Sequence, residues 1–191
     1  MKKLLFLICT LHFPFSALGA NPMLGDNQNS IRIEGVNMVD WYARDIRVFY
    51  LSYAQPNIFF RLPGQRNLQM VYISGRTKYS PEYRPGRLHS VQMVNGETSR
   101  DVSQFAWGLT QDVVFLSGWG FYMGAGIGPF VKEYKNDYIG TKFIMGERFF
   151  AGYRLNNSFN LELVAHHFSN GHLSAMNKGL DGFGLGIAWN F

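Results

Sequence analysis

The last nine residues of the chain alternate strictly between large apolar and small side chains. Phe, Leu, Ile or Trp occupies every second position from Phe183 to Phe191, and Gly, Ala or Asn fills the positions between them. A period of two is that of a β-strand with two different faces. Because the second face is small rather than polar, the strand does not suit a soluble sandwich. It suits a narrow barrel with a crowded interior and an exterior in contact with lipid.

The same period recurs along the rest of the chain and predicts eight strands. They are expected at residues 30–39, 46–55, 67–75, 101–110, 113–128, 142–155, 158–170 and 181–191. No segment after the N-terminus approaches the ~20 consecutive apolar residues of a membrane helix. The sequence therefore predicts an all-β fold, an eight-stranded antiparallel transmembrane β-barrel of the bacterial outer membrane. The terminal Phe191 resembles the signal that the barrel assembly machinery recognises, so that machinery is an expected partner.

The connectors between these strands are expected to alternate in length. Gln111-Asp112 and Asn156-Asn157 each read as a tight turn, and Asn tolerates the positive φ that such hairpins need. The longer connectors span residues 76–100, 129–141 and 171–180. This alternation is typical of short periplasmic turns and long outer loops. Only 56–66 departs from it, because it is long for a periplasmic turn.

The N-terminus has the pattern of a secretory signal. Lys2 and Lys3 precede a nearly continuous apolar run from Leu4 to Leu18, and small residues follow. A membrane anchor helix is the alternative, but the run is short and ends in a site typical of cleavage. The expected organisation is a signal segment over 1–20, a flexible lead-in over 21–29 and a barrel over 30–191. Cys9, the single cysteine, lies in the signal, so the mature chain has no thiol nucleophile.

The charge of the chain argues against nucleic acid as a partner. The formal net charge is +5, and it falls to about +3 once Lys2 and Lys3 leave with the signal. The basic residues are scattered and form no nucleic-acid-binding motif. No cofactor and no metal are expected, because the histidines do not form a set of ligands in phase.

The strand predicted at 158–170 carries a histidine and a serine on its lipid-facing side. The apolar residues that define this face are Phe159, Leu161, Leu163 and Ala165. His167 and Ser169 continue the phase, roughly 6.5–7 Å apart at Cα, so an imidazole can reach a hydroxyl. Asp181 begins the next strand on its outward phase, which brings a base, a nucleophile and an acid to one height. Donors for a developing oxyanion are expected from Asn170, the backbone amides of Gly171 and His172, and the Asn177 side chain.

Other charged residues fall on both faces of the predicted barrel. Arg148, Arg154 and Glu162 share the inward phase and are expected to form a charge network in the lumen. Glu147 falls on the outward phase, where a bare carboxylate in lipid is costly. Either a bulge near Gly146 or a position near the membrane surface would explain it.

Two short segments resemble the pattern of one enzyme family. They read His167-Phe168-Ser169-Asn170-Gly171 and Asn177-Lys178-Gly179-Leu180-Asp181. This resembles the H-x-S-N and N-x-G-x-E pattern of PagL-type lipid A 3-O-deacylases, and the likeness extends over roughly residues 113–191. The resemblance implies an eight-stranded barrel, a serine-esterase site on its outer wall and removal of the 3-position acyl chain of lipid A. Lipid A, or the lipopolysaccharide that contains it, would then be the substrate.

The resemblance also implies roles for individual residues. His167 would be the base, Ser169 the nucleophile and Asp181 the carboxylate that orients the base. Asn170 and Asn177 match positions associated with oxyanion stabilisation. The family's usual acid is Glu, which is one methylene longer than the Asp found here.

Two alternatives stay open on the sequence alone. A non-catalytic small outer-membrane barrel with a structural or adhesion role would leave lipid A unchanged. A different lipid A-modifying barrel, such as an acyltransferase, would add a chain rather than remove one. The sequence also leaves open whether the barrel is an oligomer.

Overall fold

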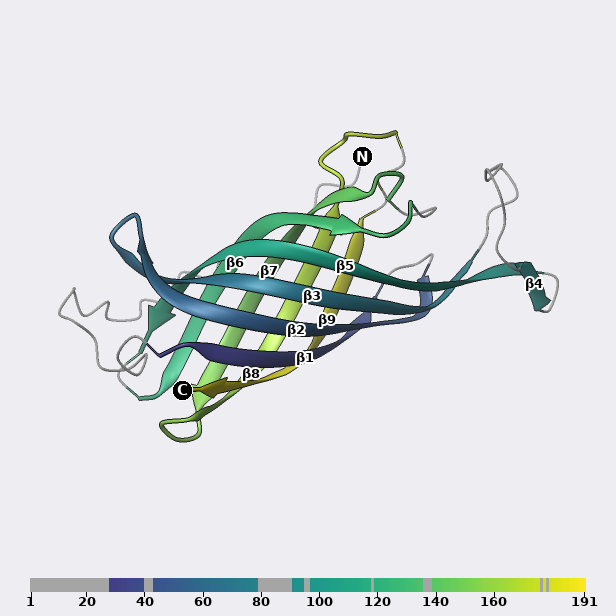
Figure 1. Cartoon of the computed structure of the whole chain (residues 1–191). Helices are drawn as coiled ribbons and strands as arrows, with labels where there is room; N and C mark the ends of the chain where they lie inside the picture. The colour runs from purple at the N-terminus through teal and green to yellow at the C-terminus, as the bar shows by residue number, and fades with distance from the viewer. Residues whose placement is uncertain are drawn as a thin grey trace, which may run out of the picture.

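The strands of the protein form one closed sheet (Figure 1). The computed structural model describes residues 28–39, 43–78, 91–94, 97–117, 119–135, 139–175, 177 and 179–191. Its strands are β1 (Ser30–Met38), β2 (Ala43–Phe59), β3 (Leu62–Lys78), β4 (Val91–Val94), β5 (Glu97–Leu116), β6 (Phe121–Lys132), β7 (Phe143–Arg154), β8 (Phe159–Ser169) and β9 (Leu180–Asn190). The predicted signal segment 1–20 and all but the end of the lead-in lie outside the described residues.

Closure of the sheet makes an eight-stranded antiparallel barrel. The strand order is β3-β2-β1-β9-β8-β7-β6-β5-β4, and β3 also pairs with β5. That additional pairing closes the ring, while β4 pairs only with residues 97–100 at one end of β5. The predicted all-β barrel is confirmed. Among the described residues, no helix is long and apolar enough to cross a bilayer.

The outer wall of the barrel is apolar along its whole circumference. On β9, Phe183, Leu185 and Ile187 are 64%, 59% and 50% exposed, as their alternation with small residues predicts. The same face of β7 carries Phe149 and Tyr153, which are also exposed. Apolar side chains displayed on all eight strands of the barrel cannot be buried within it, so this wall lies in lipid.

The barrel interior is filled and divides into two layers. The strand ends joined by the longer connectors are assigned as extracellular, as in other barrels of this kind. Toward these ends the core holds apolar side chains such as Val48, Phe130, Ile144 and Phe168, each at most 2% exposed. Toward the periplasmic ends it holds most of the buried polar and charged groups, although Lys132 and Gln104 are buried near the extracellular ends. Side chains of a small barrel therefore close the lumen instead of lining a pore.

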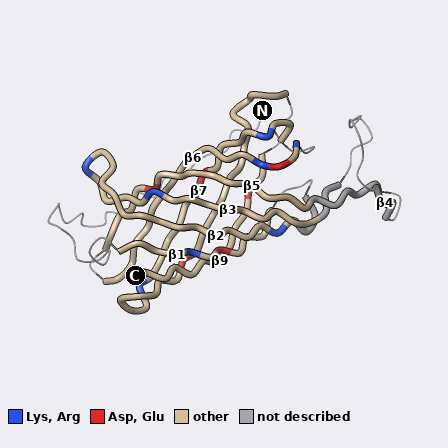
Figure 2. Tube along the Cα trace, viewed as in Figure 1, with Lys and Arg blue, Asp and Glu red and all other residues tan. Residues whose placement is uncertain are grey.

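The polar layer is built around two guanidinium groups and three carboxylates. Arg148 contacts Glu34, Asp112 and Glu162, with its Nη2 2.7 Å from Glu34 Oε1 and its Nη1 3.2 Å from Asp112 Oδ2. Arg32 adds a contact of 3.1 Å from its Nε to Glu162 Oε2. Buried charges persist only when they are paired. Of the three residues predicted to form a lumenal network, Arg148 and Glu162 belong to it, whereas the ion pairs within it do not include Arg154. Charged positions are otherwise sparse along the barrel wall (Figure 2).

Two predicted connectors are wrong in position. Gln111-Asp112 is not a turn, because β5 continues through it and Asp112 points into the lumen. The chain instead reverses between β5 and β6 near Gly120, whose φ of +81° only glycine adopts easily. Connector 56–66 is mostly strand, and the β2–β3 hairpin reverses within two residues that both have positive φ, Phe60 and Arg61.

The turn predicted at Asn156-Asn157 is confirmed and has a clear cause. Asn156 Oδ1 accepts hydrogen bonds from the backbone N–H groups of Ser158 and Phe159, at 2.8 and 2.9 Å. This side chain therefore closes the turn between β7 and β8. Because β8 starts directly after it, the turn fixes how β8 lies against β7.

Candidate active site on the outer wall

Three outward side chains at the extracellular end of β8 and β9 form the candidate active site. His167 and Asp181 are directly paired across the two strands. His167 Nδ1 lies 2.6 Å from Asp181 Oδ1, and the two side chains are 34% and 66% exposed. Ser169 is two residues beyond His167 on the same face and is half-buried. The strands therefore bring the three predicted site residues to one patch of the lipid-facing wall.

The His167–Asp181 contact decides which imidazole nitrogen is available for chemistry. A carboxylate at Nδ1 holds the proton on that nitrogen and leaves Nε2 as the basic one. Among the described residues, no hydrogen bond joins Ser169 to His167, although they share a face. A resting enzyme commonly keeps this pair apart until substrate closes the distance. Activation of the serine hydroxyl would require Ser169 Oγ to come within hydrogen-bond reach of His167 Nε2.

A second carboxylate lies beside the imidazole. Glu147 on β7 is paired directly with His167, and Met145 is paired with Ser169. The pairings of β7 with both neighbours run without a shift around Gly146. The bulge considered for Gly146 is therefore absent, and Glu147 lies in a polar row with His167 and Asp181. Sequence alternation placed Glu147 outward but did not place it opposite His167.

The loop after β8 orders the predicted oxyanion donors. The Asn170 backbone N–H donates to Asn177 Oδ1 at 2.9 Å, and the His172 N–H donates to Asn170 Oδ1 at 3.0 Å. The backbone N–H groups of Asn170 and His172 are therefore already hydrogen-bonded within the loop. These bonds also turn the Asn177 oxygen toward the loop, which leaves its NH2 group to donate elsewhere. The Asn177 side chain and the Gly171 amide are thus the better candidates for holding an oxyanion.

Glycine at position 179 lets this loop pass close to the imidazole. Gly179 has a φ of +72°, and a Cβ added there would lie 3.0 Å from His167 Cε1. Any larger residue would therefore be strained and would press on the imidazole.

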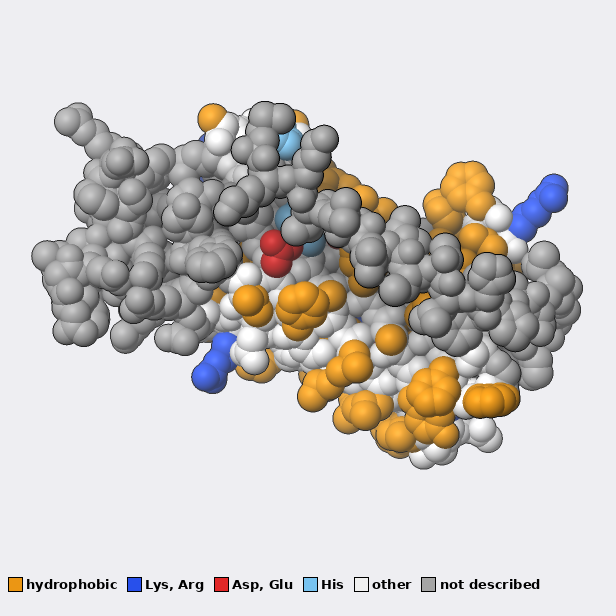
Figure 3. Space-filling view, turned by 180° about the vertical axis from the view of Figure 1, so that it is seen from behind, with side chains coloured by type: hydrophobic (Ala, Val, Ile, Leu, Met, Phe, Trp, Pro, Cys, Tyr) orange, Lys and Arg blue, Asp and Glu red, His pale blue; other side chains and the backbone are white. Residues whose placement is uncertain are grey.

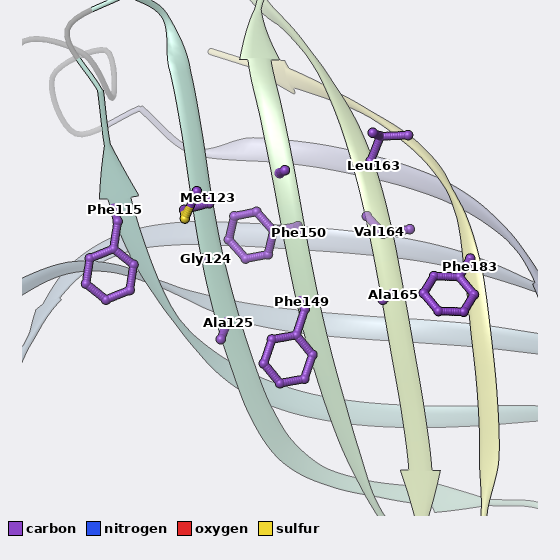
Figure 4. A pocket seen from close by; sticks show the side chains of 11 residues that line it. Phe115, Met123, Gly124, Ala125, Phe149, Phe150, Leu163, Val164, Ala165 and Phe183 are labelled. Atoms are coloured by element: carbon purple, nitrogen blue, oxygen red, sulfur yellow. The ribbon is translucent and has the colours of Figure 1, made fainter. Parts of the chain in front are cut away.

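A shallow apolar groove of about 530 Å³ lies on the wall directly below the polar row. Its small residues are Gly124, Ala125, Ala151 and Ala165, and its large outward ones are Phe115, Met123, Phe149, Leu163 and Phe183 (Figure 4). Ala165 is two residues below His167, and Phe183 is two residues below Asp181, on the same faces. The groove thus begins one row, roughly 7 Å, from the polar site. Figure 3 shows an acidic side chain beside histidine, with apolar side chains spread over the wall below them.

Residues 72–190 match the family described as lipid A 3-O-deacylase (PagL). This match covers more than half of the chain. The protein belongs to the PagL family. It is similar in fold to the outer membrane enzyme PagL, with a TM-score of 0.53 and 12% identity over 83% of this chain and 97% of that one. A de novo designed transmembrane β-barrel gives a TM-score of 0.52 at 9% identity, over 86% and 96% of the two chains.

Together with the fold, these comparisons establish the family and the cellular location of the protein. No curated protein matches the chain in sequence, so the family assignment rests on the family match. As a closed apolar-walled barrel of the PagL family, the protein is an outer-membrane protein. The PagL-type motif that the sequence suggested lies within the matched residues, and its His167, Ser169 and Asp181 fall on the one outward patch.

Other predicted residues lie apart from this patch. His166 points into the lumen, where its Nε2 lies 2.6 Å from Glu34 Oε2 and its ring stacks on Tyr50. Arg154 is half-buried at the periplasmic end of β7. The His172 side chain is exposed on the loop. Among the described residues, no three His, Cys, Asp or Glu side chains gather as a metal site.

Proposed function

We propose that this PagL-family barrel is a lipid A deacylase that hydrolyses the 3-O-linked acyl chain as a serine esterase. The observation that carries the proposal is the 2.6 Å contact of His167 with Asp181, beside Ser169 on the lipid-facing wall. A hydrolytic site that faces lipid suits a substrate that is itself a membrane lipid. The family match adds lipid A as the substrate class.

The proposed reaction uses the three side chains in the roles of a catalytic triad. Ser169 Oγ attacks the ester carbonyl carbon while its proton passes to His167 Nε2. That proton then goes to the sugar oxygen as the ester bond breaks, which leaves the acyl chain on Ser169. Water next attacks the acyl-serine, gives its proton to His167, and releases the fatty acid as Ser169 regains a proton. Asp181 holds the imidazole in the required tautomer throughout.

Groups around the triad are suited to bind both the ester carbonyl and the acyl chain of the substrate. The Asn177 NH2 group and the Gly171 amide are the proposed donors to the oxyanion that forms at the carbonyl. The acyl chain would extend from Ser169 into the groove that starts at Ala165. Because the groove runs toward the membrane interior, the chain remains in an apolar setting throughout the reaction.

Substitution of the nucleophile tests the mechanism. We expect Ser169→Ala to fold as a barrel and to abolish the loss of one acyl chain, measured by mass spectrometry of lipid A from expressing cells. The matched control is Ser74→Ala, an outward serine on β3, and it should deacylate normally.

Each alternative has its own outcome in this experiment. Lipid A unchanged by the unaltered protein would support a non-catalytic barrel, and an added chain would support an acyltransferase. Loss of a chain from another position would contradict the 3-O assignment. Undiminished deacylation by Ser169→Ala would overturn the serine mechanism.

A further inference from the structure

A buried lysine lies at the extracellular end of β6, inside the barrel. Lys132 is only 1% exposed, and its Nζ donates to the backbone oxygen of Ile139 at 2.9 Å. The Lys132 backbone N–H also donates to the oxygen of Lys142, which joins the two ends of the β6–β7 connector. An ammonium is costly to bury. Its contact with this connector therefore restrains the position of Ile139.

Ile139 in turn touches the loop of the candidate site. Its side chain is buried in the apolar layer of the core. Its backbone forms an isolated antiparallel bridge with Asn177, which lies between β8 and β9. In the described part of the chain this is the one bridge outside the strands. The β6–β7 connector thus meets the β8–β9 connector at the residue proposed to hold the oxyanion.

Asn177 passes this restraint on to the residue next to the nucleophile. Its Oδ1 accepts the backbone N–H of Asn170 at 2.9 Å, and Asn170 directly follows Ser169. A displacement of Asn177 would therefore both move its NH2 group and release the Asn170 amide. Misplacement of a positioned donor by a fraction of an ångström lowers a catalytic rate without preventing substrate binding.

We propose that Lys132 is a positioning residue for the esterase site, acting through Ile139 on Asn177. The inference rests on the proposed deacylase function. It assigns to the β6–β7 connector a part in catalysis, although none of its described residues lies on the lipid-facing triad patch. The contacts form one continuous series: the Lys132 ammonium binds the Ile139 backbone, Ile139 pairs with Asn177, and Asn177 binds Asn170 beside Ser169.

The test compares purified barrels in detergent with lipid A as substrate. We expect Lys132→Met to lower kcat roughly tenfold with KM unchanged. Lys132→Gln, which keeps a donor for the Ile139 oxygen, should recover part of that loss. The matched control is Gln69→Met, which removes another buried lumenal donor, one that bonds Thr110. It should affect barrel stability at most and leave kcat unchanged.

A double-mutant cycle separates positioning from general destabilisation. If Lys132 acts through Asn177, Lys132→Met should have little further effect on kcat in an Asn177→Ala background. Full additivity of the two losses, or an unchanged kcat in Lys132→Met, would overturn the proposal.

Amide hydrogen exchange tests the same contacts without any enzymatic assay. The Asn170 amide should exchange faster in Lys132→Met than in the unaltered protein or in Gln69→Met, because its acceptor on Asn177 is less well held. Equal exchange would contradict the inference even if the barrel deacylates lipid A. An unaltered protein without deacylase activity would instead contradict the proposed function, and the exchange result would still decide the structural link.

Discussion

The contact between His167 and Asp181 shows how a short carboxylate can reach the imidazole. The two residues are direct partners across β8 and β9, so their Cβ atoms are about 5 Å apart. At that distance Asp181 reaches the imidazole Nδ1 without the additional methylene of glutamate, at 2.6 Å. The departure from the family's usual acid is therefore compatible with the proposed role. Glu147, paired with His167 on the other side, adds a second carboxyl group to the same row.

Removal of the Asp181 charge should lower activity while sparing the fold. We expect Asp181→Asn to lower kcat roughly a hundredfold or more, because the amide favours the wrong imidazole tautomer. Asp181→Glu should keep much of the activity. The side chain is 66% exposed, so neither change should affect barrel stability. The measurement is kcat on lipid A with heat-dependent gel mobility as the folding control, and equal kcat for Asp181→Asn would refute the role.

At the scale of the strands, the β5–β9 wall combines a polar row with an apolar groove. Small residues recur at the groove on adjacent strands, among them Ala125 on β6, Ala151 on β7 and Ala165 on β8. Larger apolar side chains, such as that of Phe149, lie beside these small residues. A lipid-facing surface has no packing need for small residues, since lipid tails adapt to any shape. Their gathering directly below His167 therefore suits a bound acyl chain.

Filling the groove should weaken lipid A turnover. We expect Ala165→Leu to lower kcat/KM roughly tenfold, because its branched side chain occupies space that the acyl chain would use. The matched control is Gly35→Leu on the outer face of β1, where an added Cβ meets only Phe49 at 3.9 Å. The check is a deacylation assay on both purified variants. Equal kcat/KM values would argue that the acyl chain does not use the groove.

At the scale of the whole molecule, the barrel is a rigid support with its proposed chemistry on the outside. The apolar layer lies directly behind the site, where Phe168 packs edge-on against Phe130 with ring centroids 5.2 Å apart. Phe168 separates His167 and Ser169 in sequence and points the opposite way, so its packing anchors the strand between them. The charge network below completes a filled lumen, which leaves the outer wall as the place for a substrate.

The lumenal network should contribute strongly to stability. Arg148→Met would leave Glu34, Asp112 and Glu162 with too little positive charge, at a cost of about 3–5 kcal/mol in the free energy of unfolding. Arg47→Met, at an exposed position on β2, should change stability little. Urea unfolding in detergent micelles measures both. A loss in Arg148→Met no larger than in Arg47→Met would show that the network is not needed for folding.

Much of this architecture follows from alternation in the sequence. Alternation identifies the face of each residue, so it predicted the barrel and the outward phase of His167, Ser169 and Asp181. The outward phase is also the same on both sides of the reversal near Gly120. The faces of β5 and β6 were therefore predicted correctly, although the turn between them had been placed at Gln111-Asp112. Faces are a local property of a strand, which is why one sequence is enough to assign them.

Register, in contrast, was decided by the tertiary structure. A strand can slip by two residues against its neighbour and still keep every side chain on the same face. Alternation therefore does not indicate which residues of neighbouring strands lie opposite each other. Only the hydrogen-bonded ladders put Glu147 opposite His167, gathered the small residues of the groove, and closed β3 on β5. The bridge between Ile139 and Asn177 joins two connectors, and these segments have no alternating pattern from which their contact could be predicted. The sequence thus determined which side of the wall each residue occupies, and folding determined its neighbours there.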